Sequence, residues 1–168
     1  MFIAKNNDLI VMAADTQAEL LQKLVCMVYT EILETTENYI LHNGQYLTES
    51  EVLQQLKVQK QQENTDKAKL AVENGHVVFK GAEFETNAQT VGDLTATRLL
   101  MQAGGLETYL WLSKDDQPIS LSIEDFGTLG GLIAEFKNTI WQEKYIAYKS
   151  AIEQAETIAA VENIEIEY

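Results

Sequence analysis

Two carboxylates in alternate positions, Glu83 and Glu85, have a spacing that could support acid–base chemistry. Carboxylate pairs do such work when burial holds the pKa of one above that of the other. Alternate residues of a strand point to the same face, so both side chains would lie together. Nothing in the neighbouring sequence predicts that either is buried. We therefore favour a solvated strand face, and a minor enzyme using the Glu83/Glu85 face is the alternative.

The remaining chemically versatile residues are Cys26, His42 and His76. Cys26 lies in the apolar run 24–28 and is predicted to be a buried, inert thiol. His42 is predicted to be structural, because no second ligand is fixed beside it. Asp115-Asp116 lacks the spaced oxygen ligands of a calcium loop. We predict no catalytic, cofactor-binding or metal-binding residues and no cofactor.

Recognised catalytic motifs are absent from the sequence. It has no GxSxG, CxxC or HExxH motif, and the glycines at 127, 130 and 131 lack the lysine of a phosphate-binding loop. The sequence thus excludes the usual hydrolase and nucleotide-binding signatures.

The chain is strongly acidic. Twelve Lys and Arg residues against 26 Asp and Glu give a net charge of -14, and Arg98 is the only arginine. Phosphate binding needs clustered basic residues, so we expect no nucleic-acid partner. The first eight residues resemble no signal peptide, and no apolar run is long enough to insert in a membrane. We expect a protein made in a cytoplasm.

In the first half, strands are predicted at 2–5 and 8–12, then a helix. The capping box Thr16–Glu19 opens that helix, which is expected to end near Val28. Further strands follow at 31–35 and 39–42. Asn43-Gly44 predicts a type I′ hairpin turn that places His42 opposite Gln45.

A second capping box, Thr48–Glu51, opens a helix that contains no apolar residue from 59 to 67. A helix that is polar all round bridges through solvent or frays. We place the domain boundary here: an N-terminal α+β module at 1–56, a polar linker helix at 57–69 and a C-terminal module at 70–168. Asn74-Gly75 is expected to stop the helix in a left-handed conformation.

The C-terminal module is predicted to begin with a hairpin over 76–85 that turns at Lys80-Gly81. A helix follows, capped within Thr90–Asp93 and ended by Gly104-Gly105. A second hairpin pairs a strand at 108–112 with one at 119–121.

A long helix is predicted from the cap Ser122, whose partner is Asp125, almost without interruption to Asn163. Glycines at 127, 130 and 131 favour a break after the first turn, with close approach of a neighbour as the alternative. The apolar stripe steps sideways by one residue between Ile140 and Trp141. A helix of this length suggests a partner helix from its own or another chain. The final residues, 164–168, could form a strand or a mobile acidic tail.

The aromatic stripe of this helix supplies our candidates for protein contact. If the small module leaves part of it uncovered, it is an association surface; the alternative is that the chain buries it. The six candidates are Phe136, Ile140, Trp141, Tyr145, Tyr148 and Ile152.

Together these elements predict an α+β protein: a small ββαββ-like N-terminal module, a polar linker helix, and a C-terminal β-hairpin module closed by a long helix.

Three stretches of the second half resemble a domain of unknown function found at the C-terminus of tailed-bacteriophage tail-fibre and tail accessory proteins. They are Val78–Phe84 with Thr90, then Leu110–Asp116 with Ile119–Leu121, and the end of the long helix from Ile152 to Ile164. The first part, with Tyr39, Asn43-Gly44 and Tyr46, is similar to the small domain that often precedes it.

The resemblance implies a non-enzymatic phage or prophage tail component, or a tail-fibre assembly chaperone, that acts by protein contacts. It implies self-association or binding to another tail protein, and synthesis in the host bacterial cytoplasm with association to the virion as a further expectation. It implies no catalytic residues. A small-ligand binding module is the other alternative.

Overall fold

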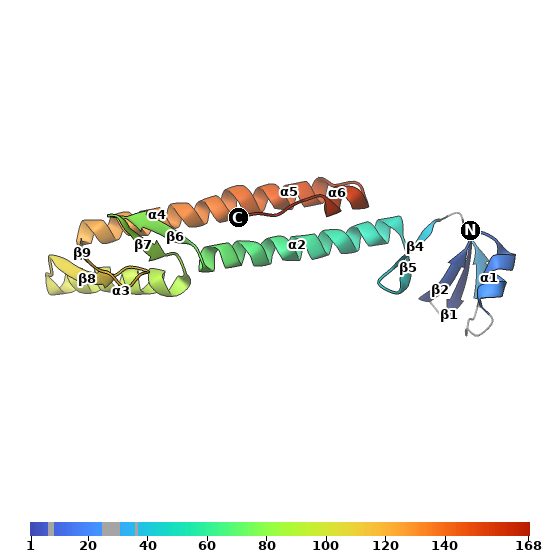
Figure 1. The fold of residues 1–168 in the computed structure, drawn as a ribbon, viewed down its shortest axis with the longest axis horizontal. Helices are drawn as coiled ribbons and strands as arrows, with labels where there is room; N and C mark the ends of the chain where they lie inside the picture. The colour runs from blue at the N-terminus through green and yellow to red at the C-terminus, as the bar shows by residue number, and fades with distance from the viewer. Residues whose placement is uncertain (7–8, 25–30, 36) are drawn as a thin grey trace. The chain divides into compact units, whose positions relative to one another are not determined.

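The computed structural model describes residues 1–6, 9–24, 31–35 and 37–168 and has the predicted α+β class (Figure 1). The chain divides into two compact units. The first comprises Met1–Lys60 with Gln154–Ile164, and the second comprises Gln61–Glu153 with Glu165–Tyr168. The division falls within helix α2, Glu49–Glu73, inside the stretch predicted as a polar linker.

The first unit contains a three-stranded antiparallel sheet in the order β2-β1-β3. The strands are β1 (Phe2–Asn6), β2 (Leu9–Ala14) and β3 (Glu31–Glu34), as the sequence predicts. The helix α1 (Gln17–Lys23) begins at Thr16, whose hydroxyl accepts from the backbone N–H of Glu19. Buried residues of sheet and helix form one core: Ala4, Ala14, Leu20 and Leu24.

Helix α1 is shorter than predicted. It ends at Lys23 rather than near Val28, and Leu24 leaves helical geometry with φ −83° and ψ 4°. The side chain of Leu24 is 5% exposed and packs in the core. Cys26, predicted to be buried, lies outside the described residues.

The hairpin β4 (Tyr39–His42) and β5 (Gln45–Thr48) has the predicted register, with His42 opposite Gln45. Asn43 and Gly44 have φ of 49° and 82°, which confirms the type I′ turn. The second capping box is also confirmed: the Thr48 N–H donates to Glu51 Oε2 at 2.8 Å, and the Glu51 N–H donates to Thr48 Oγ1 at 3.3 Å.

Both hairpins of the second unit form as predicted. Strands β6 (His76–Phe79) and β7 (Ala82–Glu85) pair with Val77 opposite Phe84. Strands β8 (Thr108–Leu112) and β9 (Pro118–Ser122) pair with Trp111 opposite Ile119. One face of each hairpin contributes to a core whose buried residues are Phe84, Leu94, Met101, Leu121, Phe126, Leu129 and Ile133.

Helix α3 (Ala88–Gly104) begins earlier than predicted. Its N-cap is Asn87, whose Oδ1 accepts from the Thr90 N–H at 2.8 Å, so Thr90 lies inside the helix. An Asn cap leads directly from β7 into the helix. The helix ends at the predicted glycines, and Gly105, with φ 64°, has a left-handed conformation.

Helix α4 (Ile123–Asn138) begins with the predicted capping box between Ser122 and Asp125. An ion pair with Lys80 and the Ser122 N–H hold the pKa of the Asp125 carboxyl below its usual value. The predicted break at the glycines is wrong, because α4 continues through all three. Phe126, Leu129 and Ile133 are buried on the same helix, and this packing outweighs the low helix propensity of glycine.

The sideways step of the apolar stripe coincides with a π-helix, η1 (Thr139–Tyr145). A π-turn holds an extra residue and so rotates the residues that follow it. Helix α5 (Ile146–Gln154) continues from η1. The predicted continuous helix to Asn163 is wrong, because Thr157 caps a separate short helix, α6 (Ile158–Glu162), and accepts from the Ala160 N–H.

None of the helices in the described part of the chain has the length and apolar character required to cross a membrane.

Candidate contact surfaces

The predicted aromatic stripe lies on α4, η1 and α5, in the second unit. Its six residues are all buried or half-buried: Phe136, Ile140, Trp141, Tyr145, Tyr148 and Ile152. Ile140 is 4% exposed and Ile152 is fully buried. The geometry therefore favours the alternative in which the chain buries this stripe itself.

The C-terminal part of α2 lies antiparallel to η1 and α5 (Figure 1). The Gln61 side-chain amide donates to the Lys149 carbonyl at 3.1 Å, and the Asn64 amide donates to the Tyr145 carbonyl at 3.1 Å. Asn64 and Ala68 are fully buried. Small and polar residues at helical spacing on α2 thus face the large side chains of the opposite helix.

Gly75, just after α2, has a different role from the one predicted. Its φ is not positive, so it is not a left-handed stop. A Cβ at Gly75 would lie 2.5 Å from two ring carbons of Phe136 and 2.7 Å from the Ala71 carbonyl oxygen. Glycine is required here because the Phe136 ring approaches the backbone closely.

The final residues form neither a strand nor a loose tail. Ile166 is 4% exposed, and its carbonyl accepts from Lys67 Nζ at 3.1 Å. The Tyr148 hydroxyl accepts from the Glu167 N–H and donates to the Glu167 carbonyl, both at 3.1 Å. The segment is therefore fixed to both helices.

Tyr168 completes this contact. Its hydroxyl donates to Asn64 Oδ1, and its ring stacks edge-to-face on Tyr148 with centroids 5.8 Å apart. Burial, and then the neighbouring Tyr148 and Tyr145, raise the pKa of the Tyr168 phenol to about 12. The segment from Glu165 onwards and residues 61–68 of α2 thus contact the aromatic stripe at Tyr145 and Tyr148.

Large apolar side chains are instead exposed on the outer faces of the two hairpins of the second unit, β6-β7 and β8-β9. Leu110 and Leu112 alternate with Tyr109 and Trp111, whose rings pack edge-on against Phe126 with centroids 6.5 and 5.4 Å away. Leu110 is 64% exposed, Leu112 57% and Val78, on β6, 64%. We call Val78, Leu110 and Leu112 the hairpin outer face.

An ion pair and a backbone bond join the two hairpins beside these residues. Lys114 Nζ lies 3.3 Å from Glu83 Oε2, and the Lys114 N–H donates to the Glu83 carbonyl at 2.8 Å. Glu83 is also the cross-strand partner of Val78. The apolar residues thus have charged neighbours, an arrangement typical of a protein-contact surface with a polar rim.

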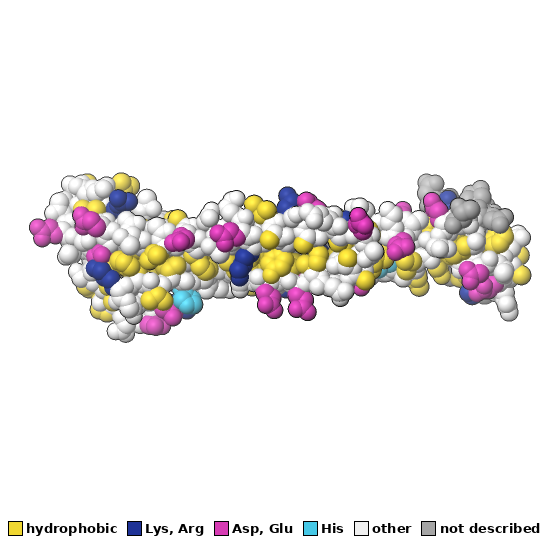
Figure 2. Space-filling model, turned by 90° about the horizontal axis from the view of Figure 1, so that it is seen from above, with side chains coloured by type: hydrophobic (Ala, Val, Ile, Leu, Met, Phe, Trp, Pro, Cys, Tyr) yellow, Lys and Arg dark blue, Asp and Glu magenta, His cyan; other side chains and the backbone are white. Residues whose placement is uncertain are grey.

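Helix α3 also exposes large apolar residues. Leu99 and Leu100 are exposed on its outer side, and Leu106 follows its end. Figure 2 shows apolar side chains gathered in a band on one face, with acidic side chains on either side of it. The sequence carried a signal for such a surface, since Tyr109–Leu112 is apolar at every position and a strand buried on one face would alternate.

The Glu83/Glu85 face lacks the features of an acid–base pair. Glu83 contacts Lys114 and, at 3.6 Å, His76 Nε2. Glu85 is exposed and accepts from the Asn87 amide at 2.9 Å. Because these carboxylates are paired at the surface, they serve as local ion-pair and hydrogen-bond partners in this geometry.

The described residues include no group of three or more His, Cys, Asp or Glu side chains that could hold a metal ion. His42 Nε2 is shielded from solvent and has no hydrogen-bond partner within the described part of the chain.

No family model, curated protein sequence or solved structure matches this chain.

Proposed function

We propose that this protein is a non-enzymatic component or assembly chaperone of a bacteriophage or prophage tail, and that it acts through protein–protein contacts. It would be made in the cytoplasm of the host bacterium. The partner would be a second copy of the chain or another tail protein. The phage setting rests on the resemblance of the segments described above.

The observation that carries the contact role is the hairpin outer face. Its three residues are each more than half exposed on regular strands, whereas the inner faces of the same strands are packed in a core. Exposed apolar side chains held on rigid elements favour binding to a partner. The acidic net charge of -14 favours a partner surface with basic groups.

Complementation tests this role. In a phage or prophage carrying this gene, deletion should reduce the yield of particles with complete tails, and the wild-type gene supplied in trans should restore it. The double variant Leu110→Glu, Leu112→Glu should fail to restore it, because two charges would enter the apolar contact. Glu107→Gln, at an exposed position outside the hairpin outer face, is the control.

Mass spectrometry of purified particles distinguishes the two forms of the proposal. A structural component remains in the particle, and a chaperone does not. Normal particle yield and intact tails after deletion would refute both.

A further inference from the structure

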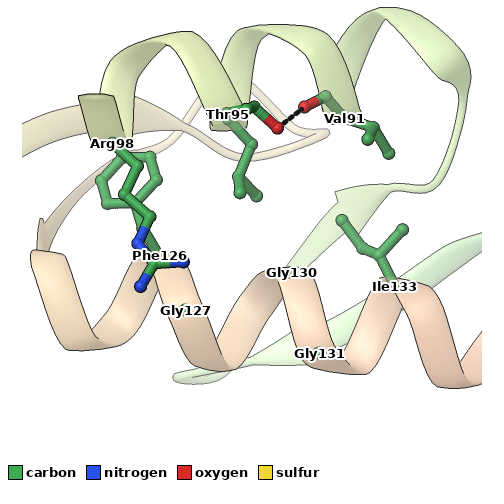
Figure 3. A pocket seen from close by; sticks show the side chains of 9 residues that line it. Val91, Thr95, Arg98, Phe126, Gly127, Gly130, Gly131 and Ile133 are labelled. Atoms are coloured by element: carbon green, nitrogen blue, oxygen red, sulfur yellow. Dashed lines mark hydrogen bonds between the residues drawn. The ribbon is translucent and has the colours of Figure 1, made fainter. Parts of the chain in front are cut away.

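A groove lies between α3 and α4 in the second unit (Figure 3). Its volume is about 340 Å³, within the range of roughly 300–1,000 Å³ typical of small-ligand sites. Gly127, Gly130 and Gly131 of α4 line one side. Leu94, Phe126 and Arg98 contribute its apolar wall and its positive charge.

The fold does not require glycine at these three positions. None of them has a positive φ. A Cβ at Gly131 would meet nothing within 4 Å. At Gly127 and Gly130 it would make ordinary contacts, at 3.8 Å with Arg98 and 3.5 Å with Leu94. In this structure, the effect of the absent side chains is to leave the groove open.

Arg98 extends from α3 across the groove towards Gly127 (Figure 3). It is the only arginine in a chain of net charge -14. No hydrogen bond or ion pair joins it to another described residue. Arg98 is exposed, and its guanidinium presents a fork of N–H donors at the open side of the groove, beside an apolar wall, with no acceptor from the described part of the chain.

We propose that this groove binds an aliphatic group that carries a carboxylate. The carboxylate would accept two parallel hydrogen bonds from Arg98, the geometry that guanidinium favours. The aliphatic part would lie against Leu94 and Phe126, over the bare backbone of the glycines. A carboxylate suits this acidic protein better than a phosphate, which carries more negative charge.

This site is independent of the proposed tail function. The same chemistry could come from a free aliphatic acid or from the C-terminal residue of a polypeptide. Two matched pairs of probes separate these sources: hexanoate with hexanamide, and N-acetyl-leucine with N-acetyl-leucinamide.

Arg98 makes the measurement direct, because a single arginine gives a single Nε–H signal in a ¹H–¹⁵N spectrum. Each probe is titrated to about 10 mM, enough to detect weak binding. At least one acid should shift the Arg98 Nε–H and the Gly130 and Gly131 amide signals. Its amide should bind about tenfold more weakly or not at all, because the charge-assisted bonds are lost.

Two variants with a matched control connect the binding to the groove. Arg98→Gln should lower the affinity for the acid to that for the amide. Gly131→Leu should weaken binding about tenfold by filling the groove. Gly92→Leu should leave it unchanged, because Gly92 is likewise open to solvent but does not line the groove. The backbone spectrum of each variant reports whether it is folded.

Binding by hexanoate alone would assign the site to free aliphatic acids, and binding by N-acetyl-leucine alone would assign it to polypeptide C-termini. The proposal is overturned if neither acid shifts these signals. It is equally overturned if acid and amide bind alike, or if Arg98→Gln binds the acid as well as wild type does.

Discussion

Asn64 is fully buried in the second unit, and both the nitrogen and the oxygen of its side-chain amide form hydrogen bonds. Its nitrogen donates to the Tyr145 carbonyl and its oxygen accepts from the Tyr168 hydroxyl. Removing one partner of a buried hydrogen bond leaves the other partner unsatisfied. Each unsatisfied group costs about 1–3 kcal/mol. We predict that Asn64→Ala lowers the free energy of unfolding by about 2–4 kcal/mol, measured by urea denaturation.

Gln62→Ala is the control for Asn64→Ala. Gln62 is exposed on the same helix, and its one side-chain hydrogen bond to a described residue is to Asp66, at 2.9 Å. Its removal should therefore change the free energy of unfolding by less than about 0.5 kcal/mol. Equal effects of the two variants would show that Asn64 does not hold this contact.

Tyr168 should make the protein less stable at high pH. Its pKa is raised from 10.0 to about 12, because its burial disfavours the phenolate. Above pH 10 the unfolded chain releases this proton while the folded protein retains it, so the stabilisation is complete below pH 10 and is lost as the pH rises towards 12. Tyr168→Phe should lack this loss.

Ultraviolet absorbance of the phenolate checks this prediction. The difference between the titrations of wild type and Tyr168→Phe should have its midpoint near pH 12. The same difference titration with Tyr39→Phe provides a comparison from the first unit, because burial also raises the pKa of Tyr39. A midpoint near 10.0, the ordinary value for tyrosine, would place Tyr168 in solvent.

At the scale of elements, the hairpin turn at Asn43-Gly44 allows backbone strain to be tested alone. Gly44 has φ 82°, and a Cβ there would meet nothing within 4 Å. Gly44→Val should therefore lower the free energy of unfolding by about 1–2 kcal/mol through the backbone conformation, not through a clash. Gly44→Asn should cost less, because Asn tolerates positive φ. Equal unfolding midpoints for wild type and Gly44→Val would exclude the type I′ turn in solution.

Gly75 provides the opposite case, in which space and not φ requires glycine. A methyl group there would overlap the Phe136 ring, and overpacking of this kind costs about 1–3 kcal/mol. Gly75→Ala should lower the thermal unfolding midpoint. Gly92→Ala, in an open part of α3, should raise the midpoint, because the higher helix propensity of Ala adds up to about 1 kcal/mol to the free energy of unfolding. A rise with Gly75→Ala would mean that Phe136 packs elsewhere.

Local patterns predicted the hairpins, the registers of the two that turn at Asn43-Gly44 and Lys80-Gly81, and the caps at Thr48 and Ser122, because turn residues and strand alternation act within a few residues. They failed where a distant partner decides the outcome. The polar run 59–67 shows no apolar stripe, yet Asn64 is buried against η1 and the last residues of the chain. The glycines of α4 similarly indicated a break that packing of Phe126 and Leu129 overrides.

The sequence predicted where the aromatic stripe lies on the helix but not what packs against it. Its helical spacing and the step at Ile140 were readable, and the π-helix lies at that step. The sequence did not show which residues contact the stripe, because the facing residues of α2 are polar or small. The sequence likewise did not indicate that Arg98 and the α4 glycines, about 30 residues apart, share a groove, since no local pattern relates them.

At the scale of the whole molecule, two apolar surfaces compete for the role of contact site, and one pair of variants distinguishes them. Tyr148 is half-buried, and its hydroxyl holds the backbone of Glu167. Tyr148→Glu should therefore destabilise the isolated protein, by about 2–4 kcal/mol in urea denaturation. Leu110 is 64% exposed, so Leu110→Glu should change the free energy of unfolding by less than about 0.5 kcal/mol.

Light scattering of the same two variants completes the comparison. If copies of the chain associate through the hairpin outer face, Leu110→Glu should reduce the average mass at high concentration, because a charge placed in an apolar contact opposes association. Tyr148→Glu should reduce stability without that specific effect. The reverse result, a stable Tyr148→Glu monomer beside an unfolded Leu110→Glu, would make the aromatic stripe the contact surface and the outer face of β8 part of the core.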